Sequence, residues 1–484
     1  MASPALPRTV LIPLIVACAL FMEQVDSTVI STSLPAIADS LNEDPVSLKL
    51  ALTSYLLSLA VFIPASGWAA DRYGARTVFR SAIVIFTLGS ILCGLSTSLA
   101  DFVLYRIIQG MGGAMMVPVG RLVILRSIPK ADLVTALAWL TVPALIGPVL
   151  GPPLGGFITT YFDWRLIFFI NVPIGILGVI LATRFIENVR EVDVPPLDLK
   201  GLVLSGLGLA GVVFGFAVMG EEMVPLWVAG AVTAIGGVAL ALYVAHARRT
   251  PHAVLDLGLL KLPTFRAGVV GASIFRVGIG ALPFLLPLML QISFGLSPLA
   301  SGLLTFASSA GALIMKTTAA PIIRRFGFRR ILVVNSLLSA AFIAVNALFT
   351  PETPHLVISV VLLIGGFFRS LEFTALNAIA YADVEQADMS RATSFASVAQ
   401  QISISMGVAV AGLVLEVMRG MRGSETLILS DFTPAFLIVA AISALSVFSF
   451  LRLPKDAGAE MAGRKRPDHD DTLPDPRGEV QPNP

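Results

Sequence analysis

The segment Gly67-Trp-Ala-Ala-Asp71-Arg72-Tyr-Gly74-Ala-Arg76 joins two long apolar stretches, residues 47–69 and 77–97. At the same place in the second half of the chain lies Ala320-Pro-Ile-Ile-Arg324-Arg325-Phe-Gly327-Phe-Arg329-Arg330. Both segments keep an Arg-x-Gly-x-Arg register, whereas the positions of Gly67 and Asp71 are taken by Ala320 and Arg324. Loops repeated at matching positions in two halves predict a duplicated six-helix unit.

Apolar stretches surround these two segments along nearly the whole chain. A helix needs about twenty apolar residues to cross roughly 30 Å of hydrocarbon. Fourteen stretches meet this need: 10–38, 47–69, 77–97, 100–122, 133–160, 165–186, 198–219, 224–245, 266–292, 298–322, 328–349, 354–378, 392–418 and 431–452. The sequence therefore predicts an all-α polytopic membrane protein with fourteen transmembrane helices.

The composition supports a membrane protein. Of the 484 residues, 56% are hydrophobic and 13% are charged, whereas soluble domains carry roughly 25% charged residues. Cys18 and Cys93 lie inside apolar stretches, so the sequence offers neither a disulfide framework nor a metal site. We expect the lipid bilayer as the surrounding partner and no nucleic-acid partner.

The basic residues set the orientation. With the N-terminus inside, the interior loops hold eighteen Lys and Arg residues, and the exterior loops hold four, namely Lys49, Arg165, Arg419 and Arg422. Cytoplasmic loops carry the excess of positive charge. The first stretch is too long for the apolar core of a signal peptide, so we expect a retained helix. The prediction is a multi-pass protein of the bacterial inner membrane with both termini in the cytoplasm.

The repeat and the spans predict four regions. We expect an N-terminal six-helix bundle over residues 1–190 and a C-terminal six-helix bundle over residues 263–453. Residues 191–262 are expected to hold two inserted transmembrane helices and a cytoplasmic linker. Low hydrophobicity with many prolines and charges predicts a disordered cytoplasmic tail over residues 454–484.

Four motifs carry a family resemblance. The segment 67–76 matches G-x-x-x-D-R-x-G-x-R, and residues 106–112 match R-x-x-Q-G-x-G. Residues 147–156 match G-x-x-x-G-P-x-x-G-G, and residues 26–35 match D-x-T-x-x-x-x-x-L-P. One further segment is typical of the family named next: Trp164-Arg165 through Phe168, with Asn171-Val172-Pro173. Over residues 10–453 the chain resembles the fourteen-span drug:proton antiporters of the major facilitator superfamily, which implies two six-helix bundles and two extra helices.

The resemblance implies conformational roles for two motifs. The first set is Gly67, Asp71, Arg72, Gly74 and Arg76. It implies a conformational latch in which Asp71 caps a helix or forms an ion pair in the outward-facing state. The alternative is that these arginines only set the membrane topology. The second set is Gly147, Pro148, Gly151, Pro152, Gly155 and Gly156. Glycines four apart let two helices approach closely, and the resemblance implies that this helix forms the face where the halves rock. A tight helix crossing alone is the alternative.

Buried charges indicate proton coupling. An ionisable side chain in mid-membrane costs at least ~2.5 kcal/mol, so such residues are functional candidates by default. Glu23 and Asp26 are three apart and share a helix face. Burial raises and a nearby arginine lowers the pKa of a carboxyl group, so a carboxyl under both effects can titrate near neutral pH. We expect Asp26 as the first and Glu23 as the second proton carrier, with Arg106 as counter-charge; a permanent Asp26–Arg106 ion pair is the alternative.

Charged and polar residues within the apolar stretches suggest the lining of a substrate cavity; for each of the amide residues the alternative is a hydrogen bond between helices. The candidates are Gln109, Arg276, Lys316, Arg369, Glu372 and Asn377, with Gln291, Gln400 and Gln401 as further polar contacts. For Lys316 the alternative is snorkelling toward the cytoplasmic interface. The basic residues would repel cations if they face the cavity, which leaves the sign of the substrate's charge open.

The sequence therefore predicts a proton-coupled efflux transporter that exports small amphipathic compounds by alternating access, with no cofactor and acting as a monomer. An exporter of anionic metabolites or citrate-like metal chelates is the alternative, and a passive channel is a more remote one. No G-x-x-x-x-G-K-[ST] loop is present, so we expect no use of ATP. No catalytic constellation is apparent, so we expect no enzyme activity.

Overall fold

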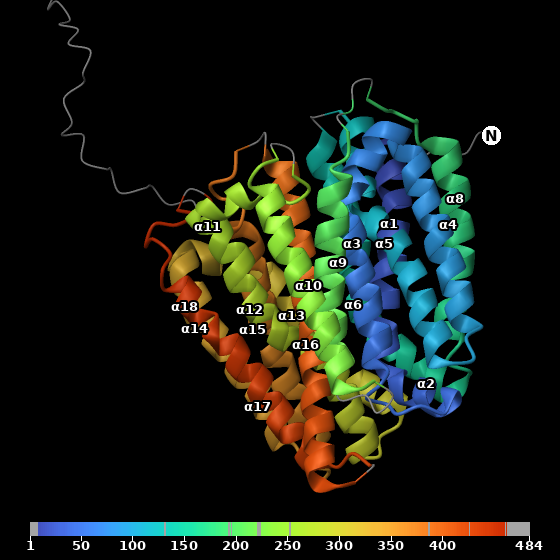
Figure 1. The fold of residues 1–484 in the computed structure, drawn as a ribbon, viewed down its shortest axis with the longest axis vertical. Helices are drawn as coiled ribbons and strands as arrows, with labels where there is room; N and C mark the ends of the chain where they lie inside the picture. The colour runs from blue at the N-terminus through green and yellow to red at the C-terminus, as the bar shows by residue number, and fades with distance from the viewer. Residues whose placement is uncertain are drawn as a thin grey trace, which may run out of the picture.

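The computed structural model describes residues 8–129, 132–191, 194, 196–219, 224–250, 253–385, 388–424, 426–459 and 461. Helices account for nearly all of this part of the chain. Figure 1 shows them as two bundles side by side, with the early helices on one side and the late helices on the other. The end of the molecule that carries α2 is called the α2 end below, and the other is called the α11 end.

The first bundle contains eight helical elements. They are α1 (Arg8–Val29), α2 (Leu34–Leu41), α3 (Lys49–Tyr73), α4 (Ala75–Gly94), α5 (Leu99–Ser127), α6 (Leu133–Tyr161), α7 (Leu166–Phe169) and α8 (Asn171–Phe185). The short 3-10 helix η1 (Ile30–Thr32) connects α1 to α2. Pro35 lies in the first turn of α2, where its missing N–H is not needed.

Two helices follow, α9 (Leu199–Ala217) and α10 (Leu226–Ala247). They pack against each other, and α9 also packs against α3 and against α16 of the second bundle. Gly211 on α9 and Gly236 on α10 meet so closely that a Cβ on Gly211 would lie 2.7 Å from the Gly236 Cα. In lipid, where helices gain little from apolar burial, such small residues permit the close backbone approach that holds the pair.

The second bundle contains the remaining helices. They are α11 (Pro263–Arg266), α12 (Ala272–Leu288), α13 (Pro298–Phe326), α14 (Phe328–Val345), α15 (His355–Ile379), α16 (Met389–Arg422), α17 (Leu429–Leu445) and α18 (Val447–Phe450). Short helices fill the junctions: η3 (Leu257–Lys261), η6 (Asn346–Leu348) and the π-helical turns η4 (Ala267–Gly271) and η5 (Met289–Ser293).

Membrane-length helices agree with the predicted spans. Thirteen helical segments of the described residues are long and apolar enough to cross a membrane, and α6, at 29 residues, is a fourteenth helix of that length. Each of the fourteen predicted stretches corresponds to one of them. The all-α architecture with fourteen transmembrane helices is confirmed.

The two repeated loops have the same backbone geometry. Gly74 ends α3 with a φ of 92°, and Gly327 ends α13 with a φ of 77°. Residues with a Cβ rarely adopt this region, so glycine is required for the sharp turn into the next helix. The Arg-x-Gly-x-Arg register therefore marks the same turn in both halves.

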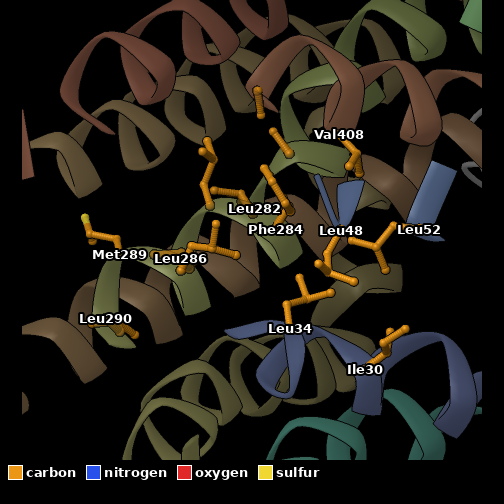
Figure 2. Close-up of a cluster of buried hydrophobic side chains, with 14 of the residues drawn as sticks. Ile30, Leu34, Leu48, Leu52, Leu282, Phe284, Leu286, Met289, Leu290 and Val408 are labelled. Atoms are coloured by element: carbon orange, nitrogen blue, oxygen red, sulfur yellow. The ribbon is translucent and has the colours of Figure 1, made fainter. Parts of the chain in front are cut away.

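An apolar cluster joins the two bundles at the α2 end. Ile30, Leu34 and Leu52 of the first bundle meet Leu282, Leu286 and Val408 of the second in this cluster (Figure 2). Two ion pairs cross the same boundary, Lys49 with Glu416 and Asp44 with Arg419. Most residues of the other two large apolar clusters belong to a single half each. The halves are therefore sealed together at the α2 end.

The region predicted as a tail begins with ordered turns. Residues 455–459 form turns, and Ala457 packs against the apolar cluster of the second bundle. Residues 460 and 462–484 lie outside the described residues.

Adjacent glycines of α10 provide a test of the α9–α10 packing. We expect Gly236→Leu to lower stability by about 1–3 kcal/mol, because its side chain would overpack the contact with α9. At Gly236 a Cβ would lie 2.7 Å from the Gly211 carbonyl carbon, whereas at Gly237 it would meet nothing within 4 Å. The melting temperature of the purified protein in detergent should fall for Gly236→Leu and stay near wild type for the control Gly237→Leu. Equal melting temperatures for the two variants would contradict this packing.

Candidate functional site

A buried polar network surrounds Asp26 in the last turn of α1. Arg106 Nη1 of α5 lies 2.7 Å from Asp26 Oδ2. Gln109 Nε2 donates to Asp26 Oδ1 at 2.7 Å, and Asn171 Nδ2 of α8 donates to the same oxygen at 3.0 Å. All four side chains are at most 1% exposed. The network ties α1 to α5 and α8, and it gives the Asp26 carboxylate a cation and two neutral donors.

The Arg106 guanidinium also lies over the ring of Tyr55, 4.1 Å from the ring centroid. Such a cation–π contact is worth more once the cation is removed from water. Breaking a buried ion pair by removing one partner typically costs about 3–5 kcal/mol, because the other charge is left buried and uncompensated. Asp26 and Arg106 therefore depend strongly on each other.

Glu23 has different surroundings, although it lies one helical turn from Asp26. Its carboxylate accepts from Gln24 Nε2 at 2.7 Å, and the Tyr55 hydroxyl lies 3.5 Å away. The side chain is 5% exposed, and no Lys, Arg or His of the described residues forms an ion pair with it. Glu23 is thus a buried carboxyl group whose hydrogen-bond partners are all neutral.

Two cavities lie between the bundles. The larger has a volume of about 390 Å³ and is lined by η1 and α6 of the first half and by α12, α13 and α15 of the second. The smaller has a volume of about 200 Å³ and lies between α1, α3 and α5 on one side and α12 and α16 on the other. Ser31 and Pro283 line both cavities, so the two spaces adjoin. The larger cavity is within the range of small-molecule sites, roughly 300–1,000 Å³.

Each cavity has its own charged lining. Glu23 and Arg106 line the smaller cavity, together with Gln400 and Gln401. Arg369 lines the larger cavity and is its only charged lining residue among those the structure describes. Arg369 Nη2 donates to Ser308 Oγ. The rest of the larger lining is apolar or carries hydroxyl groups, as at Thr28, Ser309 and Ser370.

The other charges predicted for the second half lie outside the two linings. Arg276 is 2% exposed and donates to Asn377 Oδ1 at 2.8 Å. Glu372 is fully buried and accepts from Asn335 Nδ2 at 2.9 Å. Lys316 is exposed and donates to Thr374 Oγ1 at 2.9 Å. Gln109, Arg276, Lys316, Glu372 and Asn377 are thus all outside the cavity lining.

Comparison with protein families decides the identity. The family description "Major Facilitator Superfamily" matches residues 16–265 and 268–479, which cover most of the chain. The chain belongs to the major facilitator superfamily. It is therefore a multi-pass membrane transporter of small molecules, not an enzyme, and transporters of this superfamily use no cofactor.

Individual relatives agree with this assignment. A Salmonella heidelberg (strain SL476) protein named "Putative multidrug resistance protein MdtD" is 37% identical over 464 residues, which are 93% of this chain and 96% of the relative. A protein of the same name from Escherichia coli O6:H1 is 38% identical over 462 residues, with the same coverage of both chains.

Solved structures share the fold. A D-xylose–proton symporter has a TM-score of 0.67 at 16% identity, and the match covers 93% of this chain and 98% of the symporter. An auto-inhibited peptide transporter of the POT family has a TM-score of 0.65 at 16% identity, covering 97% of this chain and 99% of that one. At these identities the likeness concerns the fold.

The glycine–proline motif of α6 packs against α1 and reaches α13. A Cβ on Gly147 would lie 2.7 Å from Gln24 Cβ. Gly151 and Gly155 face Thr28 and Val29 of α1 in the same way, and Gly156 faces Pro298 of α13. Pro148 and Pro152 line the larger cavity. This superfamily motif thus lies at the boundary between the halves as well as at the cavity wall.

Among the described residues, the motif between α3 and α4 contacts α5 and the segment that follows α8. Arg126 Nη2 of α5 lies 2.6 Å from Asp71 Oδ1 and 3.0 Å from Glu191 Oε1. Arg76 Nη1 donates to the Ile186 carbonyl at 3.3 Å. Gly67 meets nothing within 4 Å of where a Cβ would lie, so no close packing explains that glycine here.

Sequence reasoning missed several polar residues of this region. Lys49, predicted to lie in an exterior loop, begins α3, and its side chain is fully buried against Glu416. Glu416 lies near the end of the predicted span 392–418, where a charge costs less, so the sequence did not indicate a buried ion pair there. Asn171 was noted only as part of a motif, and its place inside an apolar stretch was the available signal.

The dependence of Asp26 on Arg106 can be tested by comparing two arginines. We expect Arg106→Leu to destabilise the protein by about 3–5 kcal/mol, because it leaves Asp26 buried without a cation. Arg369→Leu should cost much less, since no carboxylate of the described residues pairs with Arg369. Thermal unfolding in detergent measures both, and Asp26→Asn combined with Arg106→Leu should recover part of the loss. If the two single variants unfold at the same temperature, Asp26 does not depend on its arginine.

Proposed function

We propose that this protein is a proton-coupled antiporter that exports small amphipathic compounds across the bacterial inner membrane by alternating access. The observation that carries the proposal is Glu23. It is a buried carboxyl group that lines a cavity between the halves, has only neutral hydrogen-bond partners and lies one turn from a paired Asp26.

The distribution of charge supports an orientation with the α11 end in the cytoplasm. Loops at that end carry the large excess of Lys and Arg, and cytoplasmic loops are the positive ones. The α2 end then faces outward, and the apolar cluster of Figure 2 closes the path on that side. The described form is accordingly one that is closed to the outside.

The geometry supports Glu23 over Asp26 as the site of the exchangeable proton. The charge of Asp26 is balanced by Arg106, and both of its oxygens accept from fixed donors. Protonating Asp26 would leave the Arg106 guanidinium buried without its counter-charge, which is costly. Glu23 can gain or lose a proton without breaking an ion pair, and it lines the smaller cavity.

In the proposed cycle, Glu23 takes a proton when the cavity opens toward the outside and releases it when the cavity opens toward the cytoplasm. Substrate enters from the cytoplasm once the proton has left. Inward movement of one proton is favourable by about 2.3 kcal/mol per 100 mV of membrane potential. This drive is enough to move a substrate outward against its gradient without ATP.

Opening toward the outside must separate the seal at the α2 end. The Lys49–Glu416 and Asp44–Arg419 pairs cross that seal, so both must break in each cycle. The α6 glycines and prolines lie beside this boundary, which supports their proposed role as the face on which the halves rock.

The amphipathic class of substrate is supported by the relatives and by the larger cavity. The relatives carry the name of a multidrug resistance protein. The cavity lining is mostly apolar, with prolines, leucines and Phe373. A second candidate is an exporter of anionic metabolites or chelates. Arg369, a cavity cation that no described carboxylate pairs with, favours it.

The role of Glu23 can be tested by measuring substrate exchange and proton-driven accumulation separately. In proteoliposomes with an imposed pH gradient, we expect wild-type protein to accumulate ethidium. Glu23→Gln should lose gradient-driven accumulation but keep exchange of labelled for unlabelled ethidium. The amide keeps the shape of the side chain and an acceptor oxygen but has no titratable proton.

Citrate uptake in the same liposomes tests the second candidate. Glu372→Gln is the matched control, because Glu372 is a buried carboxyl group outside both cavity linings, and it should keep gradient-driven accumulation. Gradient-driven accumulation that survives in Glu23→Gln would overturn the assignment of the proton to this residue.

A further inference from the structure

The two adjoining cavities carry opposite charges that no ion pair among the described residues balances. In the smaller cavity Glu23 has only neutral partners, while the second charged lining residue, Arg106, is already paired with Asp26. In the larger cavity Arg369 donates to the hydroxyl of Ser308, and no described carboxylate lies within ion-pair distance of it. One free negative and one free positive group therefore face the space between the halves.

A second guanidinium, that of Arg276, adds positive charge near the larger cavity. Arg276 lies 5.0 Å from the centroid of the Phe373 ring, and Phe373 itself lines the larger cavity. The Arg276 side chain bonds Asn377, and its Nε and Nη1 atoms have no hydrogen-bond partner among the described residues. The nearest acid along α15, Glu372, bonds Asn335 and lies outside the lining. The wall around Arg369 is thus positive and carries no acid among the described residues.

Burying an unbalanced charge is costly, and each of these groups would gain from a ligand of opposite charge. Both cavities are closed at the α2 end by apolar packing, and charge pairs are stronger in a site from which water is largely removed. A ligand with only one charge could satisfy only one of the two groups.

We propose that the physiological substrate is amphoteric, with a carboxylate or similar anionic group that binds Arg369 and a protonated amine that binds Glu23. The proposal rests on the proposed antiport function, because it assigns the substrate of that same site. It also explains the exchange: the ammonium of the substrate takes the place of the proton that Glu23 releases, so the carboxylate is neutralised in both loaded states.

The geometry sets the size of this substrate. Glu23 and Arg369 line different cavities, and these cavities adjoin at Ser31 and Pro283, so a ligand that pairs with both groups must extend through both spaces. The site fits an elongated compound with charged groups at its two ends and an apolar middle, which matches the apolar lining of the larger cavity.

Three matched ligands test the proposal. We would measure binding of radiolabelled para-(aminohexyl)benzoic acid to the purified full-length protein in detergent, together with its methyl ester, which keeps only the positive charge, and its N-acetyl derivative, which keeps only the negative one. We expect the amphoteric compound to bind about tenfold or more tightly than either derivative, because it alone pairs with both groups.

Variants connect the preference to the two residues. Arg369→Gln should bring the affinity for the amphoteric compound down to that for the ester, and Glu23→Gln should bring it down to that for the N-acetyl derivative. Arg369→Lys should retain the preference, since it keeps the charge. Lys316→Gln removes a positive charge of the same half outside the lining, so it should retain the preference as well.

The outcomes separate this proposal from the proposed function. If the ester or the N-acetyl derivative binds wild-type protein as well as the amphoteric compound does, the amphoteric assignment is wrong. It is also wrong if Arg369→Gln weakens the ester and the amphoteric compound equally. Because binding needs no gradient, a strong preference without proton-driven transport in liposomes would refute the antiport function alone, and driven transport of the ester without any preference would refute the amphoteric substrate alone.

Discussion

The ion pair between Asp26 and Arg106 is the interaction on which the site depends. A charge within the apolar part of a membrane is costly unless it is paired or neutralised. Here Arg106 Nη1 lies 2.7 Å from Asp26 Oδ2, and Gln109 and Asn171 donate hydrogen bonds to the other carboxylate oxygen. The pair fixes α1 against α5 and α8. The pair also engages Arg106, the only arginine among the described residues of the smaller cavity lining. Glu23 is therefore left as a lining carboxyl group with no cation partner among the described residues.

This arrangement gives the first half a rigid charged core beside a titratable group. The second half contributes Arg369 from the opposite wall, and the seal at the α2 end holds both walls together on one side. Transport requires that seal to open, at the cost of the Lys49–Glu416 and Asp44–Arg419 pairs. Binding of protons or substrate inside the cavities and contacts at the α2 end therefore act on the same movement of the halves.

The sequence predicted the architecture well because long apolar stretches and paired glycine turns depend on local chemistry alone. Gly74 and Gly327 could be recognised from their register, and both adopt positive φ. The Asp26–Arg106 pairing could also be predicted, since two opposite charges within apolar stretches need each other. Which way a residue faces was harder to predict. The helices of this bundle are apolar on every side, so no hydrophobic periodicity shows which face of a helix lines a cavity. The sequence therefore could not tell that Arg369 lines the larger cavity whereas Glu372, three residues later, bonds Asn335 outside the lining. The Lys49–Glu416 pair was missed because each residue lies at the edge of a span, where charge is ordinary.

The central claim is that Glu23, rather than Asp26, exchanges the proton. Infrared difference spectra between low and high pH detect the carbonyl stretch of a protonated carboxylic acid directly, and they can be recorded on wild-type protein, Glu23→Gln and Asp26→Asn in lipid. The account predicts a pH-dependent carbonyl band that disappears in Glu23→Gln and persists in Asp26→Asn. A band that disappears only in Asp26→Asn would contradict it and return the proton to the arginine-paired carboxylate.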